Sequence, residues 1–400
     1  MDPRFRPVFN QAFGPGLYQK ALALLEGRLG PIPFRVAETP LFLTAELRDR
    51  LVRHSLEITS QLSRPELLTR CREAIPAHLR VPGMDELPNT VQVDFALVQG
   101  EDGGLDGRLI ELQGFPSLYA LMPAMSESWA EAMASVPGLE GPWSCYVGRD
   151  RASALELLGR TLLGGHDPEE VVLVDVDPPT QKTAPDFVAT RQLFGIDAVC
   201  VTALLQRGDK LFRRKEGREI PVRRIYNRLV FDEVLGKGVP VPFRWTDELD
   251  VSWCSHPNWY WAWSKYCLPM LDHPSVPASR LLSEIDRLPD DLSGYVLKPL
   301  FSFAGAGVVI DVTPKAVAAV PGPMRDKWIL QEKIEYAPAI VMPEGSGVKV
   351  EVRVMLARPP DSKSLEPLIL LVRLARGKML GVDFNKDLTW VGGTVGMWPA

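Results

Sequence analysis

The sequence has few cysteines, no long hydrophobic run and no excess of positive charge, and each absence excludes a class of protein. Its five cysteines are scattered, without the paired spacing of a zinc site or a disulfide framework. Its five histidines contain no His-x-x-x-His pair. No apolar run approaches the length of a membrane span. The net charge of −5, with dispersed basic residues, does not indicate nucleic-acid binding.

What is present is the composition of a globular protein, with 46% hydrophobic and 24% charged residues. A chain of 400 residues is long enough for two or three domains and a large core. An odd, dispersed set of cysteines is typical of reduced thiols. The first residues do not have the pattern of a signal peptide. We therefore expect a cytoplasmic protein that works without nucleic acid or membrane.

Two acidic strands stand early in the chain, at residues 91–98 and 108–118, joined by a glycine-rich connector. Such a connector favours a hairpin. A symmetric turn between Asp102 and Gly103 would place Asp94 opposite Glu111, because side chains alternate along a strand. Facing carboxylates repel one another unless a cation binds or a pKa rises. The hairpin is then either a Mg²⁺ site formed by Asp94, Glu111 and Gln113, or an ordinary polar surface hairpin.

The remaining periodicity predicts a mixed architecture. Apolar spacing of three and four predicts helices in much of residues 1–90 and 120–160, including one opened by Thr44 and one by Ser63. A βαβ-like unit follows, with buried strands at 171–176 and 196–201 around a helix at 184–194. Further strands are expected at 295–299, 307–312, 328–334, 348–356, 368–374 and 378–384. We divide the chain into 1–144, a small α/β domain at 145–245, and an α+β part at 246–400.

A possible phosphate-binding segment lies in the last third of the chain. Lys298 ends a predicted strand, and the small residues from Ser302 to Gly307 follow it, including Gly305. Such a loop lets backbone N–H groups approach phosphates, and a neighbouring lysine neutralises their charge. The segment is not a P-loop, because Gly-x-x-x-x-Gly-Lys-Ser/Thr is absent. Most loops of this kind are plain turns, so the segment is not specific alone.

Other polar residues recur at the ends or on one face of predicted elements. Lys265 starts a helix, and Gln331-Glu332 ends a strand where it could meet an adenine edge and a ribose. Lys349, Glu351 and Arg353 alternate onto one face of a later strand. Arg373 and Asn385 follow, before Gly392-Gly393-Thr394. Taken singly, each of these is equally typical of a solvated edge strand.

In this order the motifs resemble the ATP-grasp superfamily, whose fold clamps ATP between two α+β subdomains. In that family the metal-binding Asp and Glu-x-Asn strands usually follow the arginine strand, whereas here they precede the lysines. Asp94 matches the first carboxylate, and Glu111-Leu-Gln113 with Pro116-Ser-Leu118 matches the Glu-x-Asn…Pro-Ser-Leu segment. The chain thus resembles a circularly permuted ATP-grasp protein, as in glutathionylspermidine synthetases and eukaryotic-type glutathione synthetases. Gln113 departs from the family's asparagine.

The resemblance implies an ATP- and Mg²⁺-dependent ligase that joins a small-molecule carboxylate to an amine through an acyl phosphate, with residues 145–245 as an inserted α/β domain on the substrate side. It implies these roles: Asp94, Glu111 and Gln113 for the metal; Lys265 and Lys298 for the phosphates; Ser302, Gly305 and Gly307 for the loop over the triphosphate; Gln331 and Glu332 for adenosine; Arg353, Arg373 and Asn385 for the transferred phosphoryl group.

Two other functions remain open at this point: a phosphotransferase on the same fold, and a nucleotide-binding protein without catalysis. The sequence does not identify the substrates. Polar residues at strand ends of the α/β unit, Tyr226–Arg228 and Asp175 with Gln181–Thr183, lie where α/β folds often place ligands, although surface capping is the better explanation for them.

Overall fold

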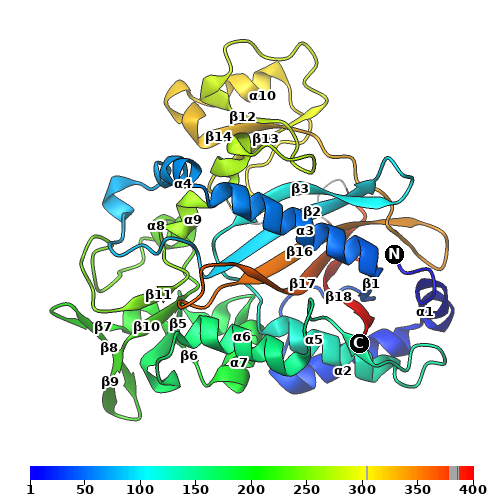
Figure 1. The fold of residues 1–400 in the computed structure, drawn as a ribbon, viewed down its shortest axis with the longest axis horizontal. Coiled ribbons are helices and arrows are strands. Elements are labelled where there is room, and N and C mark those ends of the chain that lie inside the picture. Colours follow the sequence, from blue (N-terminus) through cyan, green and yellow to red (C-terminus); the bar gives the residue numbers. More distant parts are fainter. Residues whose placement is uncertain (303–304, 378–384, 386) are drawn as a thin grey trace.

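A computed structural model describes residues 1–400 except 303–304, 378–384 and 386 (Figure 1). The largest sheet of the described part has eight strands, in the order β1-β18-β17-β16-β2-β3, with β15 beside β16 and β4 beside β18. Its pairs are antiparallel except β1 with β18. The strands are β1 (Leu41–Phe42), β2 (Thr90–Gln99), β3 (Leu105–Gln113), β4 (Trp143–Ser144), β15 (Ile340–Val341), β16 (Gly347–Ala357), β17 (Glu366–Ala375) and β18 (Gly392–Pro399).

Helices cover both faces of this central sheet. Helix α3 packs on β3 and β16 from one side, and α5 and α6 pack on the other, with α2 and α7 against α5 (Figure 1). None of the described helices combines the length and the apolar composition needed to cross a membrane. The α-helices are α1 (Arg6–Ala12), α2 (Pro15–Leu29), α3 (Ala45–Leu62), α4 (Pro65–Arg72), α5 (Leu121–Met133), α6 (Arg151–Leu163), α7 (Ala184–Phe194), α8 (Phe231–Gly236), α9 (Trp259–Ala262) and α10 (Pro314–Ala318). The 3-10 helices are η1 (Ala77–Leu79), η2 (Pro168–Glu170), η3 (Pro178–Thr180), η4 (Val201–Ala203), η5 (Lys265–Met270), η6 (Leu282–Glu284) and η7 (Gly322–Lys327).

Helix α3 shows how local sequence sets an element that later positions a site. Thr44 caps it, because its hydroxyl accepts a hydrogen bond of 3.2 Å from the Leu47 amide. Leu47, Leu51 and Ile58 form its buried stripe against the sheet. The predicted start at Thr44 is therefore confirmed. Ser63 does not cap α4 as predicted, since its hydroxyl donates to the Thr59 carbonyl instead.

A second, parallel sheet has the order β11-β10-β5-β6. Helix α7 connects β5 to β6, which confirms the predicted βαβ unit, and β8 and β9 form a charged hairpin. Strand β11 joins this sheet from beyond residue 245. These strands are β5 (Val171–Asp175), β6 (Asp197–Cys200), β7 (Leu205–Arg207), β8 (Lys210–Lys215), β9 (Arg218–Val222), β10 (Arg224–Asn227) and β11 (Ser252–Cys254).

A third, antiparallel sheet of order β12-β14-β13 forms a small lobe next to β3, at the top of Figure 1. It has its own apolar core, which includes Leu282, Leu297, Val317 and Leu330. Helix α10 packs in the same lobe (Figure 1). Its strands are β12 (Ser279–Leu281), β13 (Tyr295–Pro299) and β14 (Trp328–Glu332). The three sheets together give a mixed α+β protein, as the sequence predicts.

Two predictions for the last third of the chain differ from the structure. Residues 307–312 do not form a strand, because only Val309 makes a bridge, to Leu297. The positive φ of Gly307 (74°) interrupts the extended backbone there. Strand β18 was not predicted, because its glycine-rich start resembles a loop. It forms by pairing with β17 and β1, and Gly392 at its start lets the Arg35 carbonyl come within 2.3 Å of where a Cβ would be. The strand predicted at 378–384 lies outside the described residues.

Candidate active site

The acidic hairpin places Asp94 directly opposite Glu111, as predicted, but by a different route. The turn is centred on Asp102, since Gln99 pairs with Leu105. A β-bulge between Asp94 and Phe95 then shifts the register by one residue. The bulge restores the facing pair that the symmetric turn would have given. The Asp94 and Glu111 side chains therefore project from cross-strand neighbours in the same sheet.

Asp94 is held by two arginines from the strands beside the hairpin. Strand β16 pairs with β2 so that Arg353 lies opposite Asp94. The Arg353 guanidinium donates from Nε to Oδ1 at 2.6 Å and from Nη2 to Oδ2 at 2.7 Å. Arg373 of β17 donates to Oδ2 as well. The Asp94 side chain is 1% exposed, so its charge is balanced inside the protein by these two cations.

Glu111 faces Lys265, the first residue of η5. The Lys265 ammonium lies 3.2 Å from Glu111 Oε2 and donates to the Ser302 carbonyl at 2.8 Å. Burial alone would raise the pKa of Glu111, but Lys265 and three further cations lower it to about 2. The three are Arg373, Arg353 and Lys298. Glu111 is consequently a carboxylate at every pH at which the protein is expected to work.

Lys298 of β13 reaches the same region from the small lobe. Its ammonium donates to Gln331 Oε1 at 2.5 Å and to the Ile110 carbonyl at 3.4 Å. Burial lowers the pKa of Lys298 to about 8, against the raising effect of Glu111. The Gln331 side chain also donates to Ser279 at 3.2 Å. The Gln331 side chain therefore positions Lys298. The sequence analysis expected Gln331 to bind adenosine instead.

Gln113 lies beside the arginine that holds Asp94. With its amide oxygen turned toward Arg353, it accepts hydrogen bonds of 2.9 Å from Nη2 and 3.2 Å from Nη1. Its cross-strand partner Gln92 also accepts from Arg353 Nη1, at 2.7 Å. Gln92 was not singled out from the sequence, although strand alternation puts it on the face of Asp94. The two glutamines complete the hydrogen bonding of Arg353.

Glu351, which the sequence places on the face of Arg353 but to which no role was assigned, is a second additional site residue. It lies on β16 opposite Arg373, to which it is hydrogen-bonded, and is 4% exposed. Burial raises the pKa of Glu351 to about 7, while Arg373 opposes the rise. The carboxylates in turn raise the pKa of Arg373, although burial works the other way. Its alternation with Arg353 along one strand is the signal that would have found it.

Of the remaining predicted residues, only Ser302 has a described contact with a basic residue of this cluster. Glu332 is exposed, 3.4 Å from Arg108. Ser302 is half-buried and holds Lys265 through its carbonyl, while Phe303 and Ala304 beside it lie outside the described residues. Gly305 and Gly307 both have positive φ. Asn385 is buried and accepts backbone hydrogen bonds from Arg376 (3.2 Å) and Gly377 (2.9 Å).

A small cavity of about 20 Å³ lies between Glu111 and Lys265, enough for about one water molecule. Aromatic side chains from three segments close it, and the ring of Phe301 packs edge-on against Trp261 at 4.8 Å. The aromatic residues in its lining are Phe115, Tyr260 and Phe301. The cavity is thus lined by the charged side chains of Glu111 on β3 and Lys265 on η5, and by aromatic side chains from α9 and from the segments that follow β3 and β13.

Arg228 and Asn227 of the α/β unit are hydrogen-bonded within the protein, whereas the buried Tyr226 hydroxyl has no hydrogen-bond partner among the described residues. Tyr226, Asn227 and Arg228 are buried. The Arg228 guanidinium donates to the Pro116 carbonyl and lies 5.3 Å from the ring centroid of Phe115. These contacts attach the α/β unit to the segment that follows the acidic hairpin. Because they are buried, Tyr226, Asn227 and Arg228 are not surface caps.

Comparison with known proteins identifies a type of fold. No family model matches the sequence, and no significantly similar protein is found among curated proteins. Among solved structures, the chain has a fold similar to that of a glutathione synthetase-like protein. That protein is a glutathione synthetase-like effector of Globodera pallida in its apo form, with a TM-score of 0.55 and 12% identity over 92% of this chain and 95% of the other. At this identity the likeness concerns the fold alone.

Proposed function

We propose that the protein is an ATP- and Mg²⁺-dependent ligase that joins a small carboxylate to an amine. The observation that carries the proposal is the convergence of four basic side chains on two facing carboxylates, from segments at opposite ends of the chain. The basic residues are Lys265, Lys298, Arg353 and Arg373. A triphosphate needs this density of positive charge, because phosphoryl transfer depends mainly on positioning and charge neutralisation.

The order of the elements fits a permuted ATP-grasp arrangement. Strands β2 and β3 come early in the chain, yet β2 lies in the sheet directly beside β16 with its Arg353, and β3 pairs with β2. The likeness in fold to a glutathione synthetase-like protein supports the same view. We propose that this order reflects a circular permutation, and that residues 145–245 form an inserted unit on the substrate side.

The three predicted metal ligands, Asp94, Glu111 and Gln113, differ in how well they could bind a Mg²⁺ ion. Glu111 fits, because it is half-buried, ionised and lines the cavity. Mg²⁺ often takes one or two carboxylates and shares the phosphates of its nucleotide. Both oxygens of Asp94 accept from guanidinium groups, so Asp94 would ligate only after Arg353 and Arg373 had turned to the phosphates. Gln113 would need the same change, since it serves Arg353. The ion would supply charge neutralisation of the phosphates.

The chain's own residues have distinct tasks in this mechanism. Lys265 and Lys298 neutralise phosphate oxygens, and the Ser302–Gly307 segment approaches the triphosphate with its backbone. Glu332 is exposed and binds the ribose. The Gln331 side chain does not, because it is hydrogen-bonded to Lys298. Arg353 and Arg373 steady the transferred phosphoryl group, and Asn385 accepts a hydrogen bond from the Gly377 amide just after β17.

The proposed reaction has two steps. A substrate carboxylate attacks the γ-phosphorus of ATP, which forms an acyl phosphate and releases ADP. An amine then attacks the acyl carbon, loses a proton, and displaces inorganic phosphate to leave an amide. The aromatic wall of Phe115, Tyr260 and Phe301 would exclude water, which otherwise hydrolyses the acyl phosphate.

One observation favours a second function, nucleotide binding without turnover. Asp94 is buried and fully paired with arginines, as in a site whose metal ligand has become structural. Calorimetric binding of Mg·ATP, measured beside ADP release, distinguishes the two. Binding without ADP release in the presence of amino acids and polyamines would support the second function.

The decisive experiment for the ligase is trapping of its intermediate. Hydroxylamine converts an acyl phosphate to a hydroxamate, so a mixture of ATP, Mg²⁺ and screened carboxylates should give ADP and hydroxamate together. Glu111→Ala should abolish both while leaving the fold intact by circular dichroism. Glu101→Ala, in the exposed turn of the same hairpin, is the matched control and should keep full turnover. A phosphorylated hydroxyl product without hydroxamate would indicate a phosphotransferase instead.

A further inference from the structure

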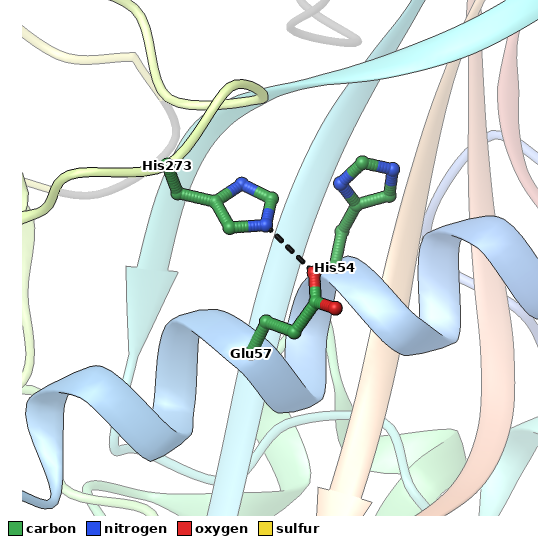
Figure 2. A group of neighbouring side chains, drawn as sticks. All are labelled: His54, Glu57 and His273. Carbon is green, nitrogen blue, oxygen red and sulfur yellow. Dashed lines mark hydrogen bonds and ion pairs between the residues drawn. The ribbon is translucent and has the colours of Figure 1, made fainter.

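A second cluster of metal-ligating side chains lies away from the candidate active site, between α3 and the segment that leads into β12. It consists of His54, Glu57 and His273 (Figure 2). One ligand atom from each of the three lies within 4.8 Å of the others. Figure 2 shows the two imidazoles and the carboxylate gathered on one side of the helix. Such a distance allows all three to bind one ion after small side-chain adjustments.

The backbone positions these side chains for a common partner. His54 and Glu57 are three residues apart on α3, and side chains at that spacing share a face of a helix. His273 comes from the opposite side, and its Nε2 lies 2.9 Å from Glu57 Oε2. The two imidazole rings are 5.1 Å apart between centroids and nearly perpendicular, at 81°. The rings do not stack, and the His273–Glu57 contact already brings the two segments together.

His54 has an unsatisfied polar side chain. Both of its ring nitrogens are shielded from solvent and lack a hydrogen-bond partner among the described residues. Asp106 Oδ1 lies 3.7 Å from its Nε2, too far for a hydrogen bond. A buried nitrogen without a partner is rare, because it forfeits its interaction with water. An ion between His54 and its neighbours would satisfy one nitrogen, and Asp106 would orient the ring through the other.

His273 has the outer contact that metal-bound histidines usually show. Its Nδ1 lies 2.8 Å from the Ser275 hydroxyl. Nδ1 also accepts from the Ser275 amide at 3.1 Å. A metal on Nε2 would move the proton to Nδ1, which would then donate to the Ser275 hydroxyl and release that amide. We propose that His54, Glu57 and His273 bind a divalent transition-metal ion, for which Zn²⁺ is the best match. Two imidazoles and a carboxylate suit Zn²⁺. They do not suit Mg²⁺, which prefers oxygen ligands.

The ion would tie together segments that adjoin the candidate active site. The residues around His273 connect η5, which starts with Lys265, to β12. The Ser275 carbonyl accepts from the Leu109 amide of β3 at 2.7 Å, and the Pro274 carbonyl accepts from Arg108 at 2.6 Å. A metal that joins this segment to α3 would therefore hold the small lobe against the central sheet.

The test is calorimetric titration of the chelator-treated full chain with Zn²⁺ alone, in the absence of nucleotide. We expect one ion per chain. His54→Ala and His273→Ala should each weaken binding about tenfold or more, and the double variant should abolish it. His78→Ala, an exposed histidine of η1, is the matched control and should bind as the wild type does. Wild-type binding by the double variant, or no stoichiometric binding by the wild type, overturns the site.

Two further measurements keep the proposal testable if the alanine variants fold poorly. Glu57→Gln changes an exposed side chain and should preserve the fold while weakening Zn²⁺ binding about tenfold. Titration with Co²⁺ reports the ligands directly, because its visible absorption depends on coordination geometry. A spectrum in the wild type that is absent from His54→Ala supports the site. An unchanged spectrum in that variant overturns it.

Discussion

Arg353 binds both carboxylate oxygens of Asp94 across two neighbouring strands, although the two residues are 259 positions apart in the chain. The pair is buried, and Arg373 adds a second cation. Removing one partner of such a pair leaves a buried charge without compensation, which costs far more than breaking a surface ion pair. The pair therefore joins the acidic hairpin to the arginine strands.

Arg353→Met should lower the free energy of unfolding by about 3 kcal/mol, because Asp94 then keeps only Arg373 as a charged partner. Urea unfolding followed by fluorescence measures the change. Arg160→Met is the matched control: its ion pair with Asp361 is exposed, and its loss should cost less than about 0.5 kcal/mol. Equal losses in both variants would contradict the role assigned to the buried pair.

The ionisation of Glu111 predicts a specific sensitivity to acid. Because the pKa of Glu111 is lowered from 4.5 to about 2, the unfolded chain binds a proton in this window that the folded chain does not. Stability should therefore fall as the pH drops from 4.5 toward 2, by up to about 3 kcal/mol from this group. Urea unfolding at pH 5, 4 and 3 should show a shallower decline in Glu111→Gln than in the wild type. Glu101→Gln should keep the wild-type slope.

Lys298 predicts proton uptake on nucleotide binding. Burial lowers the pKa of Lys298 to about 8, so above that pH the free protein holds it uncharged. A bound phosphate favours the ammonium, so binding must then take up a proton, and affinity for Mg·ATP should fall by up to about tenfold per pH unit above 8. Calorimetry in two buffers of different ionisation enthalpy measures the uptake. Lys298→Arg, always charged, should remove the dependence; no uptake by the wild type at pH 9 would contradict it.

Gly114 predicts a link between packing and activity. Its amide donates to the Trp263 carbonyl at 2.8 Å, and a Cβ there would come within 2.9 Å of the Trp259 Cβ. Gly114→Ala should force the tryptophan segment away from the hairpin, cost about 1–3 kcal/mol, and separate Lys265 from Glu111. Thermal unfolding and ATP turnover check both effects. Gly322→Ala, with nothing within 4 Å of its Cβ, should change neither.

Much of the local structure was predictable, because it depends on neighbours in sequence. Thr44 begins α3 by capping, and the glycine-rich connector turns the acidic hairpin. The strand expected at 307–312 does not form, because the positive φ of Gly307 overrides the β-propensity of the residues that follow it. Strand β18 was missed, because its pairing with β17 and β1 stabilises a glycine-rich start. Nothing in local propensity reports such a partner.

By itself, the sequence determined which side chains share a face: Asp94 with Gln92, and Arg353 with Glu351, since strand side chains alternate with period two. Only the tertiary structure decided what those faces meet. The pairing of β16 with β2 made Arg353 the partner of Asp94, and the fold of α3 against the segment before β12 brought His54 and Glu57 to His273. Such contacts depend on which distant elements pack together. Packing is set by burial over the whole chain and leaves no local pattern to read.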